Sequence, residues 1–102
     1  IIYYLLLAIK GASKMKSDYI MDLINDKGYA IATAEDTKTF LRLTADELIR
    51  QAIAGDTEEV GGAIDDIVAM IRLIDDKGWT YCYIEEHPMA ESNLNIREAG
   101  AI

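Results

Sequence analysis

Apolar residues recur at helical spacing in two stretches of the chain, with polar residues between them. The first stretch, Ser17–Gly28, carries Ile20, Leu23 and Ile24 on one side of a predicted helix. The second stretch, Asp56–Lys77, has a longer stripe in which spacings of four and three residues alternate: Val60, Ile64, Ile67, Ile71 and Ile74. This periodicity predicts one helix in each stretch.

The ends of these two helices have nearly the same sequence. "LINDKGY" occupies Leu23–Tyr29, and "LIDDKGW" occupies Leu73–Trp79. In each copy a lysine in the last turn is followed by a glycine, which tolerates the left-handed conformation that ends many helices. We therefore expect Gly28 and Gly78 to have positive φ and each copy to lead from a helix into a strand.

Three segments have the character of strands. Tyr29–Ala34 alternates apolar and small residues, Thr39–Leu43 follows a polar turn, and Trp79–Glu86 is rich in aromatic residues. The first two predict a hairpin. Thr44 and Glu47 have the spacing of a capping box, which predicts a further helix from there to about Ala54.

The apolar run Ile1–Ile9 is interpreted as a further, buried strand. The resulting order is that of a ferredoxin-like βαββαβ sandwich, an α+β fold with four antiparallel strands and helices on one face. The predicted domain spans residues 1–87, and residues 88–102 form a tail in which alternating Leu94 and Ile96 could add an edge strand. The predicted core contains Leu5, Leu7, Ile31, Leu41, Ile67 and Ile71.

An alternative interpretation makes Ile1–Ile9 a helix. The segment "DKGYAIATAEDTKTFLRLT" resembles the last helix and wing of winged-helix DNA-binding domains. The resemblance implies a wing between Tyr29 and Thr44 and contact with DNA. However, this wing would carry Glu35 and Asp36 beside Lys38 and Arg42, which is a poor surface for phosphates.

Composition narrows the range of functions. The 102 residues suit one domain, 51% are hydrophobic, and the net charge is −8. This charge disfavours binding to nucleic acid or to an anionic membrane, and it favours a partner with a basic surface. Ile1–Ile9 is too short to cross a bilayer. The single cysteine, Cys82, allows no intrachain disulfide, so we expect a cytoplasmic protein.

The segment "KGASKMKS" between the first predicted strand and the first helix is a candidate anion-binding loop. Backbone N–H groups at a helix N-terminus attract phosphates and carboxylates. The residues that could hold such an anion are Lys10, Ser13, Lys14, Lys16 and Ser17. The segment lacks the second glycine of a P-loop, and a solvated polar loop is the other interpretation.

Acidic residues form a second candidate site. Asp18, Asp22 and Asp26 lie four residues apart on the first helix, and Asp65 and Asp66 lie on the second. If both helices cover one side of the sheet, that side would be a negatively charged docking face for a partner. Two solvated helix faces are the simpler interpretation. No carboxylate spacing matches a metal-binding loop, so no metal or other cofactor is expected.

The last predicted strand places Tyr81 and Tyr83 on one face and Cys82 on the other. Aromatic side chains on a sheet can stack on bases, as in the RNA-recognition fold, or pack in a core or a dimer interface. Cys82 and His87, the sole histidine, are close in sequence, but no motif marks them as a catalytic pair. No catalytic residue is predicted.

These observations favour a small acidic protein-interaction module, rather than an enzyme, that regulates or inhibits a macromolecular partner. Inhibitors carried by phages often have this size and acidity. The partner-binding candidates are Asp18, Asp22, Asp26, Asp65, Asp66, Tyr81 and Tyr83. We expect a homodimer and a basic protein partner. The alternatives are a small-molecule or anion-binding regulatory domain and an enzyme of the dimeric α+β barrel type.

Overall fold

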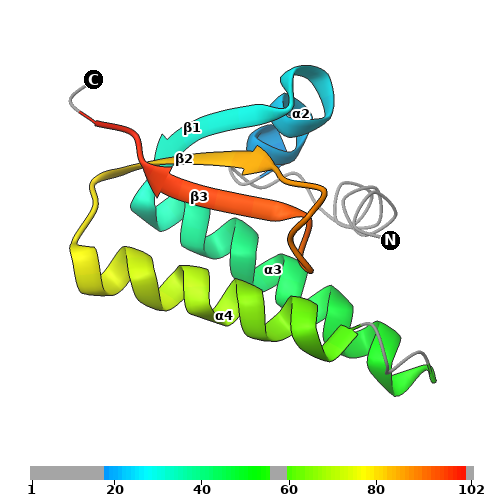
Figure 1. Cartoon of the computed structure of the whole chain (residues 1–102). Coiled ribbons are helices and arrows are strands. Elements are labelled where there is room, and N and C mark those ends of the chain that lie inside the picture. The colour runs from blue at the N-terminus through cyan, green and yellow to red at the C-terminus, as the bar shows by residue number, and fades with distance from the viewer. Residues whose placement is uncertain (1–17, 56–59, 101–102) are drawn as a thin grey trace.

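The computed structural model describes residues 18–55 and 60–100. In chain order, a helix, a strand, two long helices and two strands follow one another (Figure 1). Their bounds are α2 Asp18–Lys27, β1 Tyr29–Thr33, α3 Ala34–Ile53, α4 Val60–Lys77, β2 Tyr81–Glu86 and β3 Leu94–Glu98. The α+β class is therefore confirmed.

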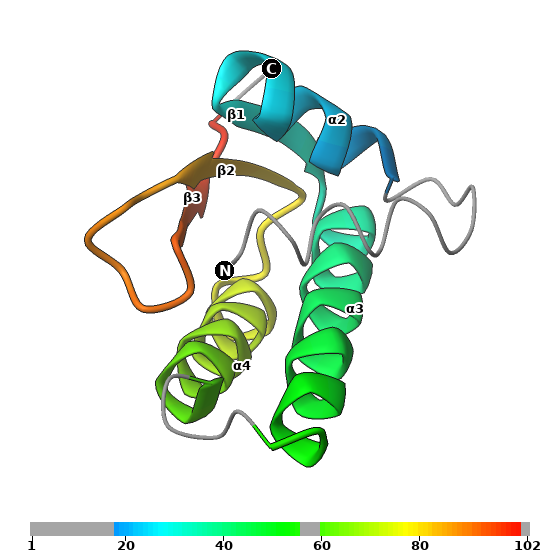
Figure 2. The same ribbon diagram turned by 90° about the vertical axis from the view of Figure 1, so that its right-hand side faces the viewer.

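The three strands form one antiparallel sheet in the order β1-β2-β3. Tyr29 lies opposite Glu85 across the first pair, and Tyr83 lies opposite Arg97 across the second. Helices α3 and α4 pack against each other as an antiparallel pair on one face of the sheet (Figures 1 and 2). The short helix α2 packs mainly against β1. The sheet therefore has one face covered by long helices.

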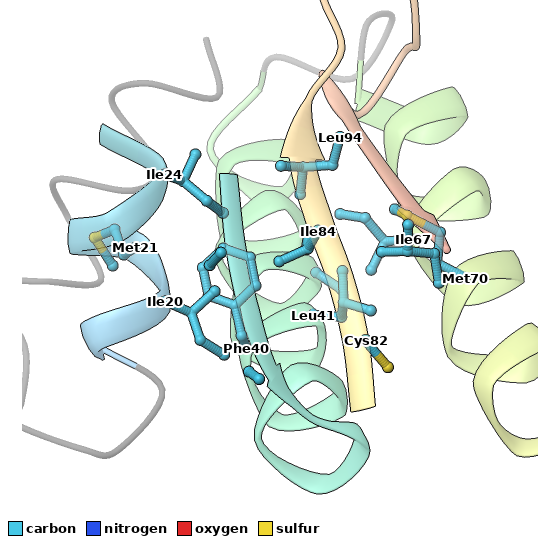
Figure 3. Packing of buried hydrophobic residues seen from close by; sticks show 14 of the residues in the cluster. Ile20, Met21, Ile24, Phe40, Leu41, Ile67, Met70, Cys82, Ile84 and Leu94 are labelled. Carbon is cyan, nitrogen blue, oxygen red and sulfur yellow. The ribbon is translucent and has the colours of Figure 1, made fainter. Parts of the chain in front are cut away.

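Burial alternates along every strand, because within residues 18–55 and 60–100 the long helices cover one face of the sheet and leave the other exposed. The inward positions are Ala30, Ala32, Cys82, Ile84, Leu94 and Ile96, and all six are buried. Figure 3 shows how side chains from the helices and strands meet in the same interior. Phe40 and Leu41 from α3, Ile20 from α2 and Ile67 from α4 are fully buried there. Each such side chain stabilises the fold by roughly 1.5–3 kcal/mol relative to an exposed one.

The predicted ferredoxin-like order is wrong, because Thr39–Leu43 lies inside helix α3 instead of forming a strand. The buried residues of α3 do follow a helical stripe: Thr37, Phe40, Leu41, Thr44, Ala45 and Leu48. Two of these positions are threonines, which hides the stripe from a search for apolar residues. In a helix each hydroxyl can be satisfied locally. Thr37 donates to the carbonyl of Thr33 at 2.8 Å, and Thr44 donates to that of Phe40 at 2.9 Å.

The N-terminal cap of α3 is Thr33, eleven residues before the predicted cap at Thr44. The Thr33 side chain accepts a hydrogen bond from the backbone N–H of Asp36 at 3.1 Å. Glu35 and Asp36 place negative charge in the first turn, where the helix dipole favours it. The expected polar turn is therefore a helix start, and the expected winged-helix wing between Tyr29 and Thr44 is absent.

The predicted core is partly right. Leu41 and Ile67 are fully buried, as expected, and Ile71 is partly buried against the cluster. Ile31 is 42% exposed, so its placement in the core is wrong. The alternation of β1 turns the two alanines inward and Ile31 outward. Leu5, Leu7 and the whole run Ile1–Ile9 lie outside the described residues.

The repeated helix ends behave as predicted. Gly28 has φ 84° and Gly78 has φ 64°. Each glycine N–H donates to the carbonyl four residues earlier, at 2.8 Å to Ile24 and at 3.0 Å to Ile74. The chain then enters β1 after the first copy and β2 after the second, and these two strands are neighbours in the sheet.

The connection between β2 and β3 is fixed to helix α4. Ser92 is buried, and its hydroxyl donates to the carboxylate of Asp66 on α4. The same hydroxyl accepts from the backbone N–H of Leu94 at 3.2 Å. The carboxylate of Glu91 lies where a β-carbon on Gly62 would stand, so a side chain at position 62 would displace the end of the flexible Glu91 side chain.

Replacement of either Gly28 or Gly78 by alanine should lower the free energy of unfolding by about 1 kcal/mol, because a β-carbon is disfavoured at positive φ. No neighbouring atom lies within 4 Å of an added β-carbon at either position, so the backbone alone should cause the loss. Urea denaturation followed by circular dichroism measures it. Gly61→Ala is the matched control: Gly61 lies in the first turn of α4 with open space around it, so its replacement should not lower stability. Equal stabilities for all three variants would contradict this account.

Candidate functional site

The face of the sheet that α3 and α4 do not cover carries the most aromatic surface among the described residues. Tyr29 is 39% exposed, and Ile31 and Tyr81 are each 42% exposed. Strand register brings all outward side chains onto this one face. We call it the open face, and it consists of Tyr29, Ile31, Thr33, Tyr81, Tyr83, Glu85, Asn95 and Arg97.

An ordered stack crosses the open face from β1 to β3. The rings of Tyr29 and Tyr83 are stacked, with centroids 5.3 Å apart and an interplanar angle of 13°. Arg97 places its Cζ atom 4.3 Å from the centroid of the Tyr83 ring. An aromatic pair of this kind contributes about 0.5–1.5 kcal/mol beyond area burial, and an exposed cation–π contact about 0.5–1 kcal/mol. These two contacts hold the Tyr83 ring in place.

The stack depends on strand register. Tyr29 lies directly opposite Glu85, and its diagonal neighbour on β2 is Tyr83. Diagonal neighbours lie within reach of aromatic side chains. Arg97 lies directly opposite Tyr83 on the other side of β2. A register slip of one residue between β1 and β2, or between β2 and β3, would turn these side chains to the other face of the sheet.

The open face is close to electrically neutral. Its charged residues are Glu85 and Arg97, one of each sign, whereas the whole chain carries −8. Glu85 accepts a long hydrogen bond from the Asn95 side chain at 3.4 Å. The ion pairs of the described residues lie on the helices instead. Lys38 of α3 lies 2.7 Å from Asp75 of α4, and its hydrogen bond to Asp75 raises the pKa of the lysine.

The acidic residues singled out from the sequence do not gather on one surface. Asp18, Asp22 and Asp26 belong to α2, and Asp65 and Asp66 belong to α4. In both views these helices lie on different sides of the molecule (Figures 1 and 2). Asp66 also accepts the hydrogen bond from Ser92, which gives it a structural role.

The candidate anion loop cannot be placed. Lys10, Ser13, Lys14, Lys16 and Ser17 all lie outside the described residues. Within the described residues, no group of three or more histidine, cysteine or acidic side chains is arranged to hold a metal ion. None of the helices in that part of the chain is long and apolar enough to span a membrane.

Cys82 and His87 do not form a catalytic pair. Cys82 faces the covered side of the sheet and is fully buried. His87 follows the end of β2, five residues later, which corresponds to about 16 Å along a strand. Burial raises the pKa of the Cys82 thiol, so the reactive thiolate is disfavoured.

Sequence reasoning identified Tyr81 and Tyr83 but missed Tyr29, Ile31 and Arg97. Tyr29 and Ile31 share the period-two alternation of β1, and that alternation already contained the signal for one shared face. The outward position of Arg97 follows from the burial of Leu94 and Ile96, because the residues that alternate with them, Asn95 and Arg97, then face outward. Their meeting with Tyr83 depends on strand order, which the sequence does not specify.

Cys82 should react with iodoacetamide only when the protein unfolds, because the buried thiol resists ionisation. At about pH 8 the native protein should be labelled at least about 100-fold more slowly than the protein in urea. As the pH rises, the Cys82 thiol ionises in the unfolded chain before it ionises in the folded protein. The contribution of this thiol to the free energy of unfolding should therefore fall above about pH 8.5. Mass spectrometry of timed samples measures the labelling. Rapid labelling of the native protein would show that Cys82 is accessible and would contradict its placement.

Comparison with protein-family models, with curated proteins and with solved structures gave no match. The family of the chain is therefore not established by similarity.

Proposed function

We propose that the protein is a small interaction module that regulates or inhibits a macromolecular partner, and that it docks through the open face of its sheet. One observation carries this proposal: Tyr29, Tyr83 and Arg97 form an ordered stack on the face that the helices leave uncovered. Tyr81 and Ile31 extend the apolar surface beside the stack. Cys82 is a free thiol, which suits a reducing compartment such as the cytoplasm.

The composition of the open face supports a protein partner. Tyrosine and arginine are enriched in the centres of protein interfaces, and they account for most hot-spot residues. Exposed apolar surface costs free energy in water, and contiguous patches of it commonly mark interaction sites. A tyrosine that is already held by two neighbours loses little conformational entropy on binding, which favours affinity.

Electrostatics argue against single-stranded nucleic acid as the ligand of this face. Such binding combines base stacking with a positively charged groove that follows the phosphates. The open face offers stacking surfaces but only one cation, Arg97, in a chain of net charge −8. Phosphate repulsion would oppose the stacking energy. Within the described residues, no observation favours the alternative functions of anion-binding regulator or α+β barrel enzyme.

Replacement of Tyr81 by alanine should weaken binding to the partner at least about tenfold, because truncation of an aromatic hot-spot residue costs about 2 kcal/mol or more and each 1.4 kcal/mol is tenfold in affinity. Tyr19→Ala is the matched control. Tyr19 is 40% exposed, close to the 42% of Tyr81, but it lies on α2 and not on the open face. Affinity capture from the native host with each variant identifies candidate partners. Calorimetry with the purified partner then gives the affinities.

The proposal requires a specific pattern of results. A partner should bind the wild-type protein and Tyr19→Ala equally, and bind Tyr81→Ala weakly, while circular dichroism shows all three folded. If a confirmed partner binds Tyr81→Ala and Tyr83→Ala as tightly as the wild type, the open face is not its docking surface and the proposal fails.

A further inference from the structure

We draw no further inference here: the strongest candidate, the outer edge of strand β3 (Leu94–Glu98), which among the described residues pairs with β2 alone, carries none because nothing in the structure shows what covers it.

Discussion

The structure depends on one constraint: among the described residues, the long helices α3 and α4 cover only one face of a three-stranded sheet. Because strand side chains alternate between faces, this divides every strand into an inward set that builds the core and an outward set that meets solvent. Ala30 and Ala32 of β1 belong to the inward set, as do Cys82 and Ile84 of β2, and all four are buried. The outward positions do not contribute to the core, yet they hold tyrosines and an isoleucine. The combination of a well-filled core and an aromatic outer face is what suggests a docking role.

Helix α3 shows how far sequence reasoning could go and where it failed. The repeated helix ends, the positive φ of Gly28 and Gly78 and the strand at Tyr81–Glu86 were all predictable, because each rests on a local signal. Thr39–Leu43 was misassigned because threonines occupy two buried positions of the helical stripe, and Thr44 has the spacing of a cap. Packing decides such cases, since a threonine hydroxyl can be satisfied inside a helix or at its start.

The candidate site was predictable only in part, for a related reason. The alternation along β2 predicts that Tyr81 and Tyr83 share one face of the sheet, but it does not determine whether helices cover that face. Exposure depends on where the helices lie, and the stack with Tyr29 and Arg97 depends on which strands are neighbours. Both are non-local properties. The acidic residues illustrate the opposite error: their spacing on each helix was right, but the two helices do not share a surface (Figure 2).

The central claim is that the open face is exposed in the isolated protein. Hydroxyl-radical footprinting with mass spectrometry measures this residue by residue. The account predicts rapid modification of Tyr29 and Tyr81, slower modification of Tyr83 and protection of buried Phe40 and Met21. The rates should not change over a wide range of protein concentration. Protection of Tyr29 and Tyr81 to the level of Phe40 would show that this face is already covered, and it would contradict the account.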